Sequence, residues 1–222
     1  MIVEGIFKDL DPDIVKFWHQ ECDEGGSDCR AVFGGTKPAG SWLQQRPGEY
    51  ARWLALLASN VKPLGHTKMV SYLEIGSAAG GSMRLAEESL LSVYPTKLFS
   101  IDNGKHVQAR FFTMWLGQHT GWIDVWIDDS HSDDTKQWLA DHNQIFNAVF
   151  VDGDHSPPGV LQDLDMIRPY LDEHSLVGCH DAMGCAKTGI DQAVASGKWK
   201  SVGFAYDEEW HRHMGIRVLQ KV

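Results

Sequence analysis

The sequence predicts an α/β fold built on an open sheet of about seven strands, with helices on both faces and an N-terminal helical cap. From residue 70 onward, short apolar runs alternate with segments of helical periodicity, which is the pattern of a parallel sheet covered on both faces. The 222 residues, of which 43% are hydrophobic, suit one compact domain with an appended segment and are too apolar for a disordered chain.

Residues 1–69 are expected to form a helical and loop-rich cap rather than an independent domain. Apolar residues predict a short helix over residues 13–20. Pro47 is expected to open a second helix that ends before Pro63. The glycines between the two helices predict a loop over residues 25–40. Residues 70–222 would then form the main domain.

Strands and helices are expected to alternate regularly in the main domain. The expected strands span residues 69–75, 97–101, 124–127, 148–151 and 175–179. The expected helices span residues 81–91, 107–116, 133–141, 159–171 and 190–195. Residues 200–205 and 216–219 would add a closing hairpin-like pair. The result is a Rossmann-like sheet.

Acidic residues recur where the five strands end. They are Glu74, Asp102, Asp129, Asp152 and Asp181. In an open parallel sheet the carboxyl ends of the strands form one crevice, and ligands bind there. Capping of the following helix explains any one of these acids about as well as ligand binding does. Capping alone does not explain all five.

The turn after the first strand reads Glu74-Ile-Gly-Ser-Ala-Ala-Gly-Gly-Ser82 and opens a helix. Glycine allows a tight turn and a close approach of the backbone to a ligand. The glycine spacing is not that of the dinucleotide fingerprint, and the acid before the turn suits a cationic ligand with an amino group. Asp102, which ends the next strand, is of the type that accepts both hydroxyls of a ribose.

These motifs resemble the class I S-adenosylmethionine-dependent methyltransferases over about residues 45–220. The resemblance is carried by residues 73–82, Phe99-Ser-Ile-Asp102, Val149-Phe-Val-Asp-Gly-Asp-His-Ser156 and Leu176-Val-Gly-Cys-His-Asp181. The last two segments are typical of small-molecule O-methyltransferases related to macrolide-sugar and cephalosporin-pathway enzymes. Gln45-Arg-Pro47 is also similar to that group.

The resemblance implies S-adenosylmethionine as the cofactor. The residues expected to bind it are Glu74, Gly76, Ser77, Gly80, Ser82, Asp102, Asp129, Ser130 and Asp152. Glu74 would lie near the cofactor's ammonium group or would order the loop. Asp102 would hold the ribose, and Asp129 and Ser130 would meet the adenine.

The resemblance also implies a catalytic pair and a metal site. His155 matches the position of a proposed general base, and Asp152 would lie beside the transferred methyl group. Asp152, His180 and Asp181 would bind a divalent metal, either Mg²⁺ or Mn²⁺. His180 stands where metal-dependent sugar methyltransferases carry an acid. Because magnesium prefers oxygen ligands and imidazole suits transition metals, this residue weakens a strict magnesium assignment.

We therefore expect a methyltransferase that acts on a hydroxyl of a small molecule, such as a sugar, a polyketide or another natural product. A nicotinamide-dependent Rossmann enzyme and a non-catalytic cofactor-binding or assembly subunit are the alternatives. The net charge of −10 argues against a nucleic-acid partner. The sequence contains no apolar run of about 18 residues, so it predicts no membrane span.

The cellular location and the assembly of the protein are predicted from its N-terminus, its cysteines and the family resemblance. Charged residues near the N-terminus interrupt any signal-peptide core. The four cysteines lack the spacing of a zinc ribbon and are too few for a disulfide scaffold, which favours a cytoplasmic protein. The resemblance implies a homo-oligomer that assembles through its N-terminal segments.

Overall fold

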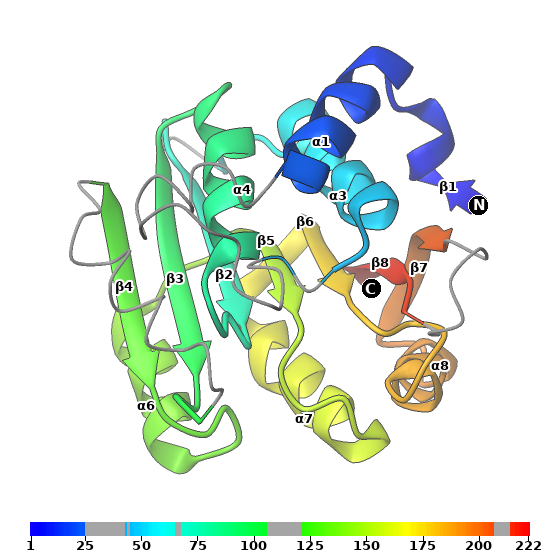
Figure 1. The fold of residues 1–222 in the computed structure, drawn as a ribbon. Helices are drawn as coiled ribbons and strands as arrows, with labels where there is room; N and C mark the ends of the chain where they lie inside the picture. Colours follow the sequence, from blue (N-terminus) through cyan, green and yellow to red (C-terminus); the bar gives the residue numbers. More distant parts are fainter. Residues whose placement is uncertain (25–42, 44, 65–67, 106–120, 207–213) are drawn as a thin grey trace.

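The computed structural model describes the chain apart from residues 25–42, 44, 65–67, 106–120 and 207–213 (Figure 1). Its described residues contain one eight-stranded sheet with the order β1-β7-β8-β6-β5-β2-β3-β4. The strands are β1 (Ile2–Gly5), β2 (Val70–Ile75), β3 (Thr96–Asp102), β4 (Trp122–Ile127), β5 (Phe146–Val151), β6 (Leu171–Cys179), β7 (Trp199–Tyr206) and β8 (Ile216–Lys221). This is the α/β, Rossmann-like fold that the sequence predicts.

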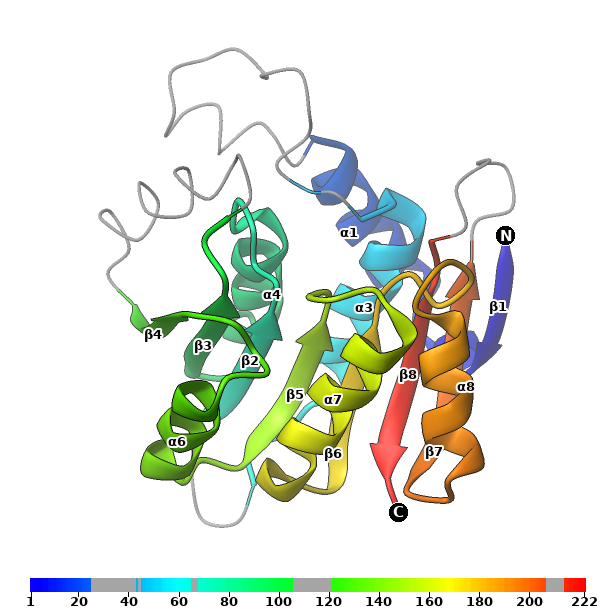
Figure 2. The ribbon, with the colours of Figure 1, turned by 90° about the horizontal axis from the view of Figure 1, so that it is seen from below.

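The five strands β2 to β6 are parallel, and the last two strands of the chain form an antiparallel pair between β6 and β1. Figure 2 shows β2, β3 and β5 running in one direction and β8 in the other. β2 lies between β3 and β5. The chain therefore moves outward from β2 to β4 and then returns to β5, so the strand order reverses between β2 and β5. Such a reversal creates a crevice at the carboxyl ends of these two strands.

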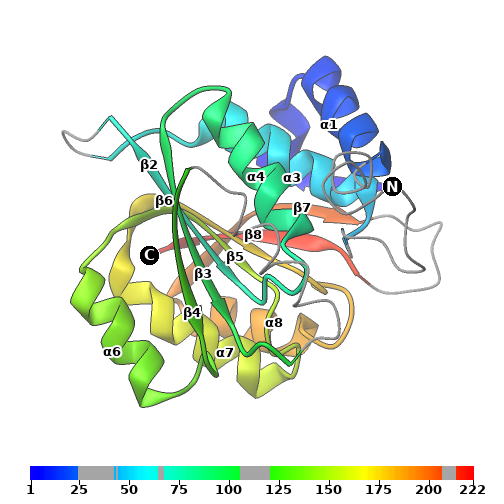
Figure 3. The ribbon, with the colours of Figure 1, turned by 60° about the vertical axis from the view of Figure 1, so that its left-hand side comes forward.

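Helices cover the two faces of the sheet in two groups (Figure 3). One face carries α1 (Pro12–Glu24), α3 (Pro47–Asn60) and α4 (Gly81–Leu91), and the other carries α6 (Asp133–His142), α7 (Pro157–Ile167) and α8 (Lys187–Ala195). The described residues also form two short 3₁₀ helices, η1 (Ile6–Asp9) and η2 (Arg168–Tyr170). Each face has its own apolar core, because the central strands are buried on both sides.

The helix α3 forms the centre of one of these cores. Its side chains from Tyr50 to Leu57 are buried except for Arg52. Trp53 packs on Phe150 of β5 with ring centroids 5.7 Å apart. Gly178 of β6 leaves room for this indole, since an added Cβ would lie 3.2 Å from it. The predicted helix from Pro47 is thus an integral layer of the fold. The division of the chain at residue 69 stays a prediction.

The structure corrects three expectations about the elements. The sheet has an eighth strand, because Ile2–Gly5 pairs antiparallel with β7, and four residues are too few to show a strand period. The helix expected over residues 159–171 ends at Ile167, two residues before Pro169, whose ring is incompatible with a helix interior. β6 consequently begins at Leu171 rather than at Ser175.

Two expectations fall on parts of the chain outside the described residues. They are the helix over residues 107–116 and most of the glycine-rich loop over residues 25–40. None of the described helices is long and apolar enough to cross a membrane. The cytoplasmic location and the homo-oligomer stay predictions.

Candidate active site

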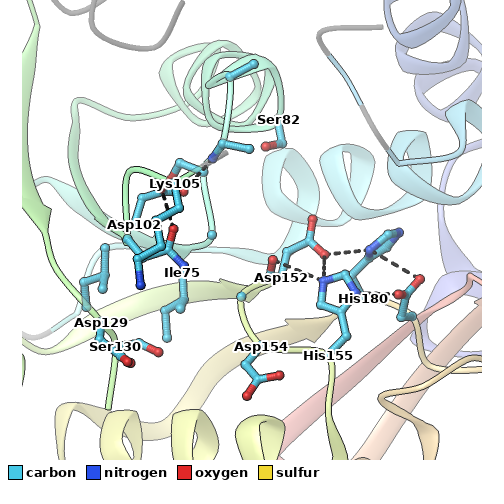
Figure 4. A pocket seen from close by; sticks show the side chains of 18 of the residues that line it. Ile75, Ser82, Asp102, Lys105, Asp129, Ser130, Asp152, Asp154, His155 and His180 are labelled. Atoms are coloured by element: carbon cyan, nitrogen blue, oxygen red, sulfur yellow. Dashed lines mark hydrogen bonds and ion pairs between the residues drawn. The ribbon is translucent and has the colours of Figure 1, made fainter. Parts of the chain in front are cut away.

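A cavity of about 650 Å³ opens at the carboxyl ends of β2 to β6, where the strand order reverses (Figure 4). The predicted residues that line it are Gly76, Ser77, Ser82, Asp102, Asp129, Ser130, Asp152, His155, His180 and Asp181. Glu74 and Gly80 are absent from its lining. Gln45 and Met214 line it from outside the strand ends. The expectation of one crevice that collects the strand-end residues is met for most of them.

The turn after β2 brings three strands together. The Gly76 N–H donates to the carbonyl oxygen of Ile101 at 2.8 Å, and the Asp152 N–H donates to the carbonyl oxygen of Ile75 at 2.9 Å. Gly76 has a φ of +87°, and an added Cβ would lie 2.2 Å from the carbonyl oxygen of Asp152. Both the backbone conformation and the space therefore require glycine at this position.

The same turn ends in the first residues of α4. Gly80 adopts the left-handed conformation, with a φ of +82°, and caps the helix. Residues 76–79 and Ser82 line the cavity. A helix N-terminus carries free N–H groups and a partial positive charge, so it favours a carboxylate or phosphate of a ligand.

Glu74 orders the start of α4 and does not line the cavity. Its buried carboxyl group accepts hydrogen bonds from the Tyr72 hydroxyl at 3.0 Å and from the Ser82 hydroxyl at 2.5 Å. Burial raises the pKa of Glu74 to about 8, so the group is largely neutral at pH 7. Of the two roles considered for Glu74, the structure favours ordering of the loop.

Asp102 connects the loops after β2 and β3. Its carboxylate accepts hydrogen bonds from the Ala78 N–H at 2.8 Å and from the Gly104 N–H at 2.7 Å. These bonds use one carboxylate oxygen each, and a carboxylate oxygen has two lone pairs. Asp102 can therefore fix the two loops and still accept hydrogen bonds from a ligand in the cavity.

The loop after β4 carries Asp129, Ser130 and His131. Asp129 accepts a hydrogen bond from the His131 N–H at 2.9 Å, and the Ser130 side chain is buried at the cavity wall. The His131 Nε2 lies 3.1 Å from Asp163 Oδ1 on α7. No sequence pattern singles out His131 or Asp163, because an Asp inside a helix and a His in a loop show no recognisable spacing.

Two aspartates and two histidines meet at the ends of β5 and β6 (Figure 4). Asp152 Oδ1 lies 2.7 Å from His180 Nδ1 and 3.1 Å from His155 Nε2. His155 Nδ1 lies 2.6 Å from Asp181 Oδ2. These contacts connect all four side chains, which come from two neighbouring parallel strands and the loops that follow them.

The contacts in this cluster favour its charged forms. The hydrogen bonds with Asp152 and Asp181 raise the pKa of His155 to about 11. Burial opposes ionisation of Asp152, but His180 and His155 outweigh it and hold the pKa of Asp152 well below its usual range. Both ring nitrogens of His155 thus face carboxylates. A general base needs a free lone pair, so the base role of His155 stays a prediction that requires release of one of these contacts.

Among the residues that the structure describes, two groups of side chains could hold a metal ion. Asp152, His155 and His180 present ligand atoms within 4.8 Å of one another, and so do His155, Asp181 and Cys185. The predicted set of Asp152, His180 and Asp181 overlaps both groups. The first group offers two imidazole nitrogens and one carboxylate oxygen, a donor set that suits transition metals better than magnesium.

Gln45 also reaches the cluster, from the chain just before α3. Its Nε2 donates a hydrogen bond to Asp152 Oδ2 at 2.5 Å, although 107 residues separate the two. In the sequence, Gln45 stands out only as part of the Gln45-Arg-Pro47 resemblance, which implies no role for it. Its position two residues before the helix-opening Pro47 predicts that it precedes α3, but no sequence signal predicts its contact with Asp152.

Comparisons with known proteins agree with this geometry. Residues 73–182 match the model of a family described as a methyltransferase domain. No match to the chain was found among curated protein sequences.

Among solved structures, a putative caffeoyl-CoA O-methyltransferase from Staphylococcus aureus is similar with a TM-score of 0.61 and 12% identity, over 96% of this chain and 100% of that chain. A TDP-rhamnose 3′-O-methyltransferase of calicheamicin biosynthesis has a TM-score of 0.57 and 12% identity, over 95% of both chains. A Methanococcus jannaschii fibrillarin pre-rRNA processing protein has a TM-score of 0.55 and 13% identity, over 74% of this chain and 73% of that chain. The TM-scores show a shared fold. Sequence identities this low do not indicate which substrate the protein uses.

Proposed function

Because residues 73–182 belong to the methyltransferase-domain family and the chain has the class I methyltransferase fold, we propose that the protein transfers the methyl group of S-adenosylmethionine to a hydroxyl of a small molecule. The observation that carries this proposal is the cavity at the β2/β5 reversal. It combines the Gly76 turn, the start of α4 and the acid Asp102. A nucleoside with a charged amino-acid part needs these three features together.

Each part of the cofactor has a matching part of the cavity. Asp102 would accept hydrogen bonds from the two ribose hydroxyls, and Asp129 and Ser130 would border the adenine. The cofactor's carboxylate would face the start of α4, where the helix dipole favours negative charge. Gly76, Ser77, Gly80 and Ser82 would shape the turn around the methionine part. Glu74 would support it indirectly through Ser82.

The reaction breaks the bond between the sulfonium and the methyl group and forms a bond between that methyl group and the acceptor oxygen. The acceptor hydroxyl would give its proton to His155, once one of the contacts of His155 with Asp152 and Asp181 is released, and S-adenosylhomocysteine is the second product. Asp152, His155 and His180 line the cavity at a distance from Asp129 (Figure 4). Asp181 lies beside His155. These four side chains would orient the hydroxyl in line with the methyl group, and such positioning supplies much of the rate enhancement in methyl transfer.

The acceptor is a small molecule in this proposal. The chain carries a net charge of −10, and the cavity wall contains several acids, among them Asp128, Asp129 and Asp154. Phosphate backbones favour basic surfaces, so both features support a small acceptor over a nucleic acid.

A divalent metal would be held by Asp152, His155 and His180 and would lower the pKa of the acceptor hydroxyl. With the metal bound, His155 would be a ligand rather than the base, and water would take the proton. We expect calorimetry to show binding of Mn²⁺ to the wild-type protein and weaker binding of Mg²⁺, because two of the donors are imidazoles. His180→Gln should weaken Mn²⁺ binding by about tenfold or more, as loss of a ligand does. Asp154→Asn, a change to an acid outside this group, should leave it unaltered. Absence of Mn²⁺ binding, or tighter binding of Mg²⁺, would contradict the metal assignment.

The test of the proposed function is calorimetry with S-adenosylhomocysteine. We expect the wild type to bind it and to bind neither NAD nor NADP. Asp102→Ala should weaken binding by about 100-fold or more, because two hydrogen bonds to a charged acceptor are lost.

Asp102 also holds two loops together, so its replacement needs a control for structure. Asp102→Asn keeps a side chain that can accept one loop hydrogen bond, and thermal melting of both variants reports any loss of fold. Failure of the wild type to bind S-adenosylhomocysteine, or equal binding by a folded Asp102→Ala protein, would refute the proposal.

A further inference from the structure

The cavity needs a partner for the positive charge of its proposed cofactor. The sequence suggests Glu74 for this role, but Glu74 is fully buried, bonded to Tyr72 and Ser82, and outside the cavity lining. The acid Asp152 does line the cavity, and Gln45 lies against it. Asp152 and Gln45 are therefore the candidates for the partner of the cofactor's positive charge.

The orientation of the Gln45 amide follows from its neighbour. Asp152 Oδ1 already faces His155 and His180, and Asp152 Oδ2 faces the Gln45 amide. A carboxylate accepts hydrogen bonds and does not donate them, so Gln45 must present its N–H group to Asp152. The amide oxygen Oε1 then points to a different neighbour.

Within the described part of the chain, Gln45 Oε1 has no hydrogen-bond partner although it is buried. Gln45 is 6% exposed and lines the cavity. Buried polar atoms are normally paired, and exceptions call for an explanation such as a missing ligand. An amide oxygen can pair only with a donor, so the ligand group that meets it must carry an N–H or an O–H.

We propose that Gln45 Oε1 accepts a hydrogen bond from the ammonium group of the cofactor's methionine part, and that Gln45 and Asp152 together form the ammonium subsite. This inference rests on the proposed function. The ammonium group is a charged donor, and the carboxylate of Asp152 beside it adds a favourable charge. The cofactor's own carboxylate fits neither oxygen and instead suits the start of α4. The two charged groups of the methionine part are thereby assigned to different parts of the cavity wall.

The decisive comparison uses S-adenosylhomocysteine and its desamino analogue, which lacks only the ammonium group. In calorimetry we expect the wild type to bind the analogue at least tenfold more weakly. Gln45→Met has nearly the same length and removes both the donor and the acceptor. It should weaken binding of S-adenosylhomocysteine about tenfold and should leave binding of the desamino analogue within about twofold of the wild type, since a lost hydrogen bond to a charged group has this size.

Ser130→Ala serves as the matched control at the other end of the cavity. It should weaken both ligands by the same factor and keep the discrimination between them, because separate sites act additively. A folded Gln45→Met protein that still discriminates as the wild type does would overturn the assignment, and so would a wild type that binds both ligands equally. Failure of the wild type to bind S-adenosylhomocysteine at all is a separate outcome, which refutes the proposed function itself.

Discussion

His131→Leu is expected to lower the free energy of unfolding by about 3 kcal/mol at neutral pH. The residue faces Asp163, whose side chain is fully buried and has neither oxygen hydrogen-bonded to a described residue. The His131 Nε2 at 3.1 Å is the counter-charge that the structure gives this carboxylate. Its removal leaves a buried, unpaired charge. The value is at the lower end of the range for buried pairs, because the imidazole is 23% exposed.

The effect should depend on pH in a defined direction. The contact with Asp163 raises the pKa of His131 above its usual value of 6.5. A raised histidine pKa stabilises the fold fully below pH 6.5, and this stabilisation is lost as the pH rises through the folded-state pKa. Urea unfolding at about pH 6 and about pH 9 should therefore show a larger difference between wild type and His131→Leu at the lower pH.

A double variant separates the charge from the packing. In His131→Leu/Asp163→Leu both charges are gone, and replacement of a buried ion pair by apolar residues is often neutral or stabilising. We expect the double variant to recover most of the stability that His131→Leu loses. A single variant within about 0.5 kcal/mol of the wild type would show that Asp163 is compensated in another way, because surface changes without a structural role have that size.

Much of the fold follows from local patterns that need no tertiary information. β2 and β5 are mostly apolar and buried at every residue because both faces of their sheet are covered, and Pro47 starts α3 as its geometry predicts. β1 was missed because four residues carry no period and because its partner β7 lies about 200 residues away. A short edge strand of this kind is decided by the sheet it joins.

For the candidate site, the sequence likewise predicts which residues approach one another at the strand ends. Asp152 and His180 follow adjacent parallel strands, so the strand ends alone predict their approach, and the structure places them 2.7 Å apart. The direction of a side chain was not predictable. Glu74 ends up bonded to Ser82 because helix α4 packs on its face of β2. The contact of Gln45 with Asp152 depends on where the start of α3 lies in the fold, which no local pattern encodes.

Gly76→Ala should be among the most damaging single changes in the protein, with a loss of about 3 kcal/mol or more of stability. Two costs add at this position. The φ of +87° is unfavourable for a residue with a Cβ, by about 1–2 kcal/mol. The new Cβ would also lie 2.2 Å from the carbonyl oxygen of Asp152, which is backbone and has little room to move, because the Asp152 N–H is bonded to Ile75. The strands β2 and β5 would have to separate where the cavity begins.

Gly197→Ala isolates the first of these costs. Gly197 has a φ of +73°, and an added Cβ there meets no atom within 4 Å. Its replacement should cost about 1 kcal/mol or less, because alanine also restricts the unfolded chain. Unfolding in urea then gives the contact term as the difference between the two variants. S-adenosylhomocysteine binding should fall sharply in Gly76→Ala and stay unchanged in Gly197→Ala. Equal losses of stability in the two variants would mean that backbone conformation alone requires Gly76, and that the approach of β2 to β5 does not shape the cavity.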